Sequence, residues 1–410
     1  MHALIQRELR EWSFNPKGDV LGGCVSAFSV IPEVIGFTLV AGVDPILGLY
    51  TSIAFLILMS FFGGRPALVS AGAGSMAVVV VALIRDYGLD YLFAAVLLAG
   101  VIQFILGLCR IGNLTRFVPK SAVAGFVDAL AIIIFKAQVT SCLDHMGSAA
   151  ASIAKMLVFI AVGLLVIYLF PKLTKAVPST LVSIVVVTVV CLIVGAVGSN
   201  TDVAMISDLG NLKAAWPKLA LPQVPASFET LRVILPYSVS LAFVGLLETM
   251  LGARVVDEMT DSTSSKNREC CAQGIGNLAC GLIGAMPGCA MIGQAVANVE
   301  SGGRGRLSTL VSGVLLACLL GFGSAVLGAV PLAALIAVMI YVSITTFDWK
   351  FLKDMVTKHD LMSVLATIET VVTVILVVAT NNFAIGVGAG LALHFLFWLC
   401  TRNRTGAVVG

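Results

Sequence analysis

The sequence predicts an all-α polytopic membrane protein, and three observations support this prediction. Hydrophobic residues make up 59% of the 410 positions and charged residues only 11%, with a mean hydropathy of +1.04, a composition outside the range of soluble domains. Apolar stretches of about 20 residues, the length that crosses a bilayer core as a helix, recur from Val20 to Cys400. These runs are too long and too continuous for the alternating strands of a membrane barrel.

We expect fourteen transmembrane segments, arranged as two repeats of seven. The longest polar stretch, residues 198–231, contains Pro217, Pro222 and Pro225 and is predicted to be an extracytoplasmic linker between the first repeat (18–197) and the second (232–400). An odd number of segments per repeat gives the second repeat the opposite orientation, as in many secondary transporters. The expected segments are residues 18–41, 45–62, 70–84, 91–109, 120–140, 153–170, 177–197, 232–255, 268–285, 289–300, 307–327, 330–346, 361–379 and 383–400.

The basic residues indicate how the chain is oriented. Most of the 25 Lys and Arg residues fall in segments on one side of the predicted membrane, which the positive-inside rule assigns to the cytoplasm. We therefore expect the N-terminal segment 1–17 and the tail 401–410 to be cytoplasmic, in a bacterial inner membrane. The N-terminal segment is polar and amphipathic, which does not match a signal peptide.

Two expected segments are shorter than their neighbours, begin with small residues, and hold the third and tenth places. Short, glycine-interrupted segments at matched places of two repeats point to a binding site. If both half-helices end near the midplane, their N-termini supply unpaired N–H groups and positive dipole ends for an anion. The alternative is that these small residues only allow close helix packing. The predicted substrate-binding residues are Ser70, Gly72, Gly74, Ser75 and Met76 in one half-helix, and Gly288, Cys289, Ala290, Met291, Gly293 and Gln294 in the other.

Two carboxylates interrupt apolar segments in matched places of the two repeats, and such groups are costly in a bilayer. Glu33 follows Pro32, and Phe37 lies one helical turn later, so both side chains are predicted to border the substrate. Glu33 could instead brace neighbouring helices. Glu248 has no basic residue within one turn, which favours an ion-coupling role with a bound proton or Na⁺ over a purely structural buried acid.

Several classes of function are not supported by the sequence. The ten cysteines and four histidines show no metal-ligand spacing, so we expect no metal site and no cofactor apart from the coupling ion, H⁺ or Na⁺. No nucleotide-binding or hydrolase motif is present, which argues against an enzyme and for transport driven by gradients. The net charge of +3 gives no reason to expect nucleic acid as a partner. The charged stretch RVVDEMTDSTSSKNREC is expected to be a solvated helix end on the inner side, or else a gate contact.

Two long stretches resemble the SulP family of sulfate permeases and related anion transporters. The first is GGCVSAFSVIPEVIGFTLVAGVDPILGLYTSI followed by FFGGRPALVSAGAGSMAVV, and the second runs from ETMLGARVV through QGIGN, AMPGCAMIGQ and SGGRGR to LVSG. The resemblance covers essentially the whole predicted membrane region. It implies a seven-plus-seven inverted repeat, with a core domain (segments 1–4 and 8–11) that moves against a gate domain (5–7 and 12–14), and a homodimer.

The sequence departs from the family pattern at its C-terminal end and at several positions of the predicted site. Family members usually continue into a cytoplasmic STAS domain, whereas this chain ends at Gly410, so we expect a membrane domain without it. Members with a Na⁺-coupled bicarbonate role resemble Asp-x-x-x-Thr in the eighth segment, where this sequence has Glu248 and Gly252, a difference that favours proton coupling. Gln294 replaces an Arg of animal relatives, and Glu33 replaces a Gln of many members.

The resulting functional prediction is a secondary active transporter of a small inorganic anion, with sulfate as the first candidate, working by H⁺-coupled symport and an elevator-like movement. A Na⁺-coupled bicarbonate transporter, or a dicarboxylate or nucleobase permease of the same fold, is the alternative, because a second carboxylate disfavours sulfate unless a proton accompanies it. A non-transporting membrane protein or a channel is a further alternative. The expected partners are the anion, the lipid bilayer and a second copy of the chain.

Overall fold

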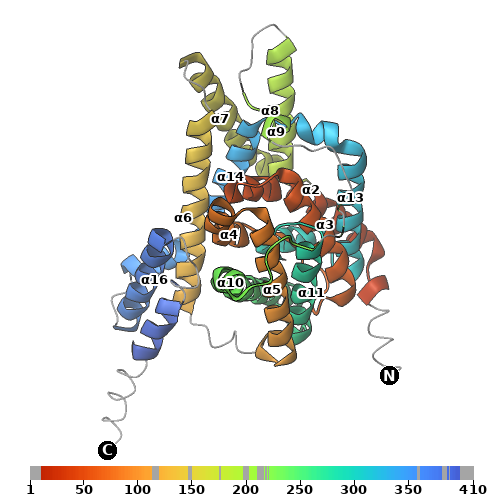
Figure 1. Cartoon of the computed structure of the whole chain (residues 1–410). Coiled ribbons are helices and arrows are strands. Elements are labelled where there is room, and N and C mark those ends of the chain that lie inside the picture. Colours follow the sequence, from red (N-terminus) through yellow and green to blue (C-terminus); the bar gives the residue numbers. More distant parts are fainter. Residues whose placement is uncertain are drawn as a thin grey trace, which may run out of the picture. The chain divides into compact units, whose positions relative to one another are not determined.

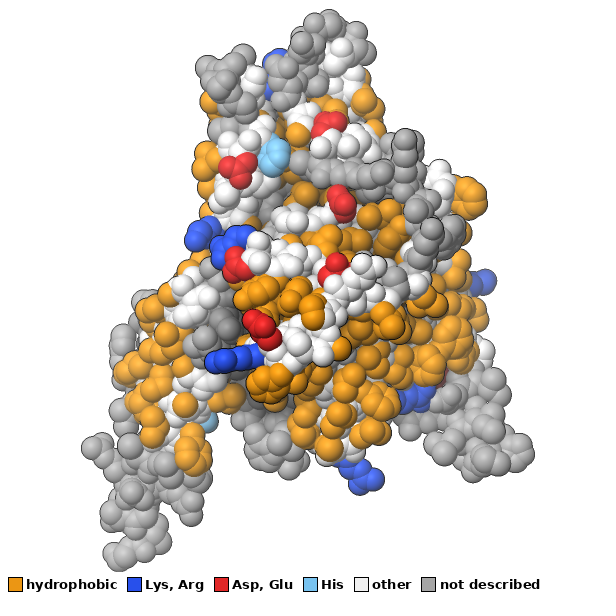
Figure 2. Space-filling model, in the orientation of Figure 1, with side chains coloured by type: hydrophobic (Ala, Val, Ile, Leu, Met, Phe, Trp, Pro, Cys, Tyr) orange, Lys and Arg blue, Asp and Glu red, His pale blue; other side chains and the backbone are white. Residues whose placement is uncertain are grey.

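The computed structural model of this chain is mostly helical (Figure 1). It describes residues 11–112, 120–145, 150–174, 177–196, 203–209, 217, 219, 221–357, 361–380, 386 and 388–397. Within these residues, 8 helices are long and apolar enough to cross a membrane, namely α2, α3, α5, α6, α7, α10, α13 and α16. The visible face of the molecule is correspondingly dominated by hydrophobic side chains, with only scattered charges (Figure 2).

The helices follow the expected segments closely. The first repeat contains α2 (Pro16–Ala41), α3 (Pro45–Phe62), β1 (Ser70–Gly72), α4 (Gly74–Tyr87), α5 (Leu89–Leu108), α6 (Lys120–His145), α7 (Ala150–Leu173) and α8 (Ser179–Ala196). Then follow α9 (Ile206–Leu209), α10 (Phe228–Thr260), α11 (Lys266–Leu282), β2 (Gly288–Ala290), α12 (Ile292–Glu300), α13 (Arg306–Gly328), α14 (Leu332–Thr346), α15 (Trp349–Thr357), α16 (Leu361–Thr380) and a helix over Gly388–Phe397. The seven-plus-seven arrangement itself stays a prediction.

Three expectations about boundaries were wrong. The half-helices do not start near Ser70 and Gly288, because those residues form strands and the helices begin at Gly74 and Ile292. Helix α10 starts at Phe228, inside the predicted linker, since the Ser227 hydroxyl caps it by accepting from the Thr230 N–H at 3.2 Å. The linker also contains the short helix α9, and α15 was not expected at all. The tail 401–410 lies outside the described residues.

The chain divides into two compact units. Unit 1 comprises residues 1–113 and 137–341, and unit 2 comprises residues 114–136 and 342–410, so that each predicted repeat contributes to both. Within unit 2, the backbone N–H of Asp348 donates to the Asp128 carboxylate at 2.7 Å, and the Thr370 hydroxyl donates to the Ser121 carbonyl at 2.9 Å. The half-helices and both predicted carboxylates belong to unit 1.

Helices α5 and α11 pack side by side in unit 1 (Figure 1). Glycines allow this packing, because a methyl group at Gly274 would lie 2.6 Å from the Phe104 nitrogen and 2.7 Å from the Gly100 carbonyl oxygen. A methyl group at Gly100 would in turn lie 2.7 Å from the Leu278 nitrogen. The two backbones are therefore in direct contact, as is common where small residues join membrane helices.

We predict that Gly274→Ala destabilises the protein by about 1–3 kcal/mol, because the added methyl group must push α5 and α11 apart. Thermal unfolding in detergent, followed by size-exclusion chromatography, measures the effect. Gly321→Ala is the matched control, since a methyl group there meets no atom within 4 Å. An equal melting temperature for the two variants would contradict the assigned packing.

Candidate functional site

Two short strands bring the predicted half-helices together. Strands β1 and β2 pair antiparallel, with Ser70 opposite Ala290, Ala71 opposite Cys289, and Gly72 opposite Gly288. Helix α4, with 14 residues, and helix α12, with 9 residues, start immediately after these strands. At 1.5 Å per residue they extend only about 21 Å and 14 Å, short of the roughly 30 Å of a bilayer core.

The pairing places the two helix N-termini close to one another, and neither is capped by a side chain. The N-cap residues Ala73 and Met291 make no side-chain capping hydrogen bond. The first N–H groups to donate to a cap carbonyl are those of Ala77 and Ala295, at 2.9 and 3.0 Å. The N–H groups of residues 74–76 and 292–294 thus precede the first helical bond. Together with the two positive dipole ends they form a site suited to an anion.

The glycines of the two helix starts differ in what surrounds them. A methyl group at Gly293 would meet no atom within 4 Å, so the backbone at the start of α12 borders open space. A methyl group at Gly74 would instead lie 2.6 Å from the Phe37 ring, which therefore packs against the start of α4. The structure thus brings Phe37 to the start of α4 and leaves open space in front of Gly293, while the substrate-binding role of both stays a prediction.

Glu248 of α10 lies against both half-helices. The Ser75 hydroxyl, at the start of α4, donates to a Glu248 carboxylate oxygen. The Cys289 thiol in β2 donates to the same oxygen at 3.3 Å, and the two donors lie 4.0 Å apart. This carboxylate from the eighth segment therefore connects the start of one half-helix to the strand that precedes the other.

Glu33 reaches the opposite half-helix. The Gln294 side chain, in the first turn of α12, lies close enough to the Glu33 carboxyl group to interact with it, and Gln294 itself is buried. The two carboxylates predicted from the sequence thus border the same pair of helix starts, one at α4 and the other at α12. An anion bound at these helix starts would lie near both carboxyl groups.

The remaining predicted residues are also brought together, but several are buried in protein contacts. The Gln273 side chain donates to the Ser70 hydroxyl at 2.9 Å, and the Gly72 N–H points to the Ser52 hydroxyl at 3.4 Å. The Met76 side chain packs on Gly245, where a methyl group would lie 2.4 Å from its terminal carbon. These three, with Gly288, Ala290 and Met291, are buried.

The sequence did not single out the polar side chains that hold β2 in place. The Asn277 side chain accepts from the Gly288 N–H at 3.0 Å, donates to the Gly288 carbonyl at 3.1 Å, and donates to Gln103 at 2.8 Å. The Thr249 hydroxyl accepts from the Ala290 N–H at 3.2 Å. The sequence did contain an indication of Asn277 and Thr249, because each is a polar residue in an expected transmembrane segment.

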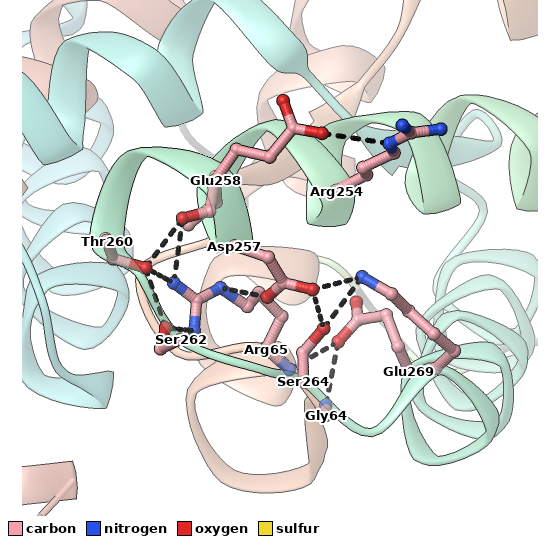
Figure 3. Close-up of polar contacts among 11 residues, drawn as sticks. Gly64, Arg65, Arg254, Asp257, Glu258, Thr260, Ser262, Ser264 and Glu269 are labelled. Atoms are coloured by element: carbon pink, nitrogen blue, oxygen red, sulfur yellow. Dashed lines mark hydrogen bonds and ion pairs between the residues drawn. The ribbon is translucent and has the colours of Figure 1, made fainter.

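A buried ionic network lies just before β1 in the chain (Figure 3). Arg65 pairs with Asp257 at 3.2 Å and donates to Ser262 at 2.9 Å and to Thr260. Burial lowers the pKa of Arg65, and the carboxylates of Asp257 and Glu269 oppose that effect. The charged stretch around Asp257, expected to be solvated, is therefore partly buried, because it neutralises a guanidinium that the fold encloses.

The network extends to the strand pair. Glu269 accepts from the Gly64 and Arg65 N–H groups at 2.7 and 3.0 Å (Figure 3), and its other oxygen accepts from Gln273 at 2.9 Å. Gln273 in turn donates to Ser70. A continuous chain of polar contacts thus joins the loop after α3 to β1, which fixes the position of the helix that follows.

Comparison with known proteins identifies close relatives. The family model described as the sulfate permease family matches residues 17–370. The putative sulfate transporter YbaR of Bacillus subtilis is 48% identical over 395 residues, covering 96% of this chain and 79% of that protein. The bicarbonate transporter BicA of Picosynechococcus sp. is 30% identical over 404 residues, covering 92% of this chain and 69% of that protein.

Solved structures show the same fold. The transmembrane domain of a cyanobacterial bicarbonate transporter, BicA, has a TM-score of 0.76 at 25% identity and covers 91% of this chain and 97% of its own. Murine Slc26a9, an anion transporter in the inward-facing state, has a TM-score of 0.78 at 18% identity and covers 98% of this chain and 72% of its own.

We predict that Gly293→Val abolishes anion binding while leaving the fold intact, because its side chain fills the open space before α12. A thermal-shift titration with sulfate and with bicarbonate measures binding. The unliganded melting temperature should stay within about 2 °C of wild type, as expected for a change that meets no neighbour, and the anion-induced rise should vanish. Gly321→Val controls for the added side chain, and a retained anion-induced rise in Gly293→Val would refute the assigned site.

Proposed function

This chain belongs to the sulfate permease family, and we propose that it is a secondary active transporter that carries a small inorganic anion across the bacterial plasma membrane. Sulfate is the first candidate, since YbaR, 48% identical, is named a putative sulfate transporter. The family consists of transporters, and the protein is accordingly not an enzyme. The apolar helices and the relatives make it a multi-pass membrane protein.

The observation that carries the proposal is the pair of uncapped helix starts that β1 and β2 hold together. Backbone N–H groups can replace part of an anion's hydration without a fixed basic side chain, so the ligand can be bound and also released. A permanently charged Lys or Arg side chain would bind an anion more tightly, but it would hinder the return of the empty carrier to its starting conformation. Neutral donors therefore suit a carrier that must run through both loaded and unloaded states.

Glu248 is the proposed coupling residue, with a proton as the coupling ion. Within the described part of the chain, the hydrogen bonds to the Glu248 carboxyl group come from one hydroxyl and one thiol, those of Ser75 and Cys289. Thiols are poor ligands for hard cations, which prefer carboxylate, carbonyl and water oxygens. A proton on Glu248 removes the repulsion between this carboxylate and an incoming anion, so that each ligand favours the binding of the other.

Bicarbonate is the second candidate substrate. Two carboxyl groups, of Glu33 in α2 and of Glu248 in α10, lie next to residues in the first turns of the two half-helices. Two negative groups disfavour a divalent anion more than a monovalent one. BicA, which matches both in sequence and in fold, is named a bicarbonate transporter. Dicarboxylates and nucleobases stay as further alternatives for this fold.

The transport cycle that we propose is an elevator-like movement of a core domain containing the two half-helices against a gate domain. We further propose that the chain forms an inverted seven-plus-seven repeat, that it assembles as a homodimer, and that its N- and C-termini are cytoplasmic. The polar contacts that connect β1 to the loop at Arg65 and to Glu269 support the elevator-like movement. A site that moves as one body must keep its two helix starts in fixed positions relative to each other.

We predict that Glu248→Gln uncouples transport from the proton gradient, because an amide can neither take up nor release the proton. In proteoliposomes, an inward proton gradient should accelerate wild-type uptake at least about fivefold, the lower end of typical coupling between two ligands, and should leave Glu248→Gln unaffected. Glu258→Gln, on the exposed end of the same helix, is the matched control. Unchanged pH dependence in Glu248→Gln would show that the coupling residue lies elsewhere.

We predict that labelled sulfate accumulates in wild-type proteoliposomes under an imposed proton gradient and that replacing Na⁺ by choline has no effect. Parallel assays with bicarbonate and fumarate, and competition by uracil, separate the alternative substrates. Accumulation of bicarbonate that follows the Na⁺ gradient would reject the sulfate–proton proposal. The absence of any concentrative uptake would reject secondary active transport altogether.

A further inference from the structure

An apolar cavity of about 410 Å³ lies in unit 1, on the side of α2 away from the anion site. Its volume is within the range of pockets that hold small ligands, about 300–1,000 Å³. Helices α2, α8, α13 and α14 and the short helix α9 all contribute to its walls. Thr188 of α8 is the one polar side chain among the described residues that line it.

The cavity opens on the outer surface of α8. Val185 and Val189 line the cavity, yet they are 53% and 47% exposed. Leu192 and Ile193, one turn further along, are also exposed, at 53% and 56%. In a membrane protein an exposed apolar stripe of this kind faces acyl chains, so the cavity is continuous with the surface that contacts the bilayer.

One end of the cavity is closed by a small backbone pairing. The Ile206 N–H donates to the Val330 carbonyl at 3.0 Å, and the Leu332 N–H donates to the Ala204 carbonyl at 2.8 Å. Ile206 and Val330 both line the cavity and are buried. An occupant therefore enters sideways between the helices rather than from the aqueous end near α9.

The cavity lies directly behind the residues that form the anion site. Phe28, Ile31, Pro32 and Ile35 of α2 line it, and their spacing places them on one helical face. Glu33 is about 100° further round from Pro32, and its carboxyl reaches Gln294. Pro32 has no N–H to donate to the Phe28 carbonyl, so α2 lacks one backbone hydrogen bond at the place where it lines the cavity.

We propose that this cavity binds one acyl chain of a bilayer phospholipid and that the chain supports α2 behind Glu33. An acyl chain matches an almost wholly apolar lining, and it is the molecule that the exposed side of α8 meets at the highest concentration. The Thr188 hydroxyl is buried and has no hydrogen-bond partner in the described part of the chain, and an acyl chain needs none from it.

The test is a thermal-shift titration of the detergent-solubilised protein with dioleoylphosphatidylglycerol, with dihexanoylphosphatidylglycerol as the short-chain probe of the same headgroup. The long-chain lipid should raise the wild-type melting temperature by on the order of 2 °C or more, and the short-chain lipid should not. Equal responses to both lipids would show headgroup binding and overturn the proposal.

Two glycines of α13 give a matched pair of variants. A side chain at Gly323 enters the cavity, whereas Gly321 lies two residues away outside the lining, and a methyl group at either position has room. Gly323→Phe should lose the response to the long-chain lipid, and Gly321→Phe should keep it. A full response in Gly323→Phe would overturn the proposal.

Thr188→Val separates an acyl chain from a polar ligand, because it keeps the shape of the side chain and removes the hydroxyl. The lipid response should be unchanged, and its loss would indicate an occupant recognised by a hydrogen bond. If Gly323→Phe does not fold, a phospholipid with a photoreactive acyl chain can label the wild-type protein. Labelling of α2, α8 or α13 at the cavity is expected, and labelling confined to other helices would overturn the proposal. None of these measurements depends on the transported anion.

Discussion

The antiparallel pairing of Ser70–Gly72 with Gly288–Ala290 is the constraint on which the rest of the site depends. Extended backbone within a membrane leaves its N–H and C=O groups without partners unless protein supplies them. Here the strand pairing and the side chains of Asn277 and Thr249 supply such partners, and each strand leads directly into a half-helix. The pairing therefore fixes where both helices begin and brings their N-termini close together, and helix N-termini are the part of a helix that can bind an anion without a basic side chain.

The surrounding polar residues maintain this pairing. Asn277 holds Gly288 by both its backbone groups, Thr249 holds Ala290, and the connection from Glu269 through Gln273 holds Ser70. Each such side chain would be costly in an apolar segment if left unpaired. Together they make the site rigid, and a rigid site suits a carrier in which the binding residues move as one body. In the proposed mechanism, the two carboxylates are the groups whose charge changes with the bound anion.

The sequence allowed the helical segments, the two short segments and both carboxylates to be predicted, because membrane spans are long and intramembrane acids are rare. The strands could not be predicted, since three-residue stretches of small residues carry no periodic signal and their pairing joins residues far apart in the chain. The role of Asn277 was not recognised because it depends on β2, the strand whose Gly288 it binds. The charged stretch around Asp257 was misjudged because its buried partner, Arg65, lies about 190 residues earlier in the chain.

The most direct test of the account is the position of a bound anion. Crystals of the protein grown with selenate, a heavier analogue of sulfate, would show the anion by its anomalous scattering. The account predicts a peak within hydrogen-bonding distance of the N–H groups at the starts of α4 and α12, between Ser75 and Gly293. Selenate bound elsewhere in the membrane region, with no peak between these helix starts, would contradict it.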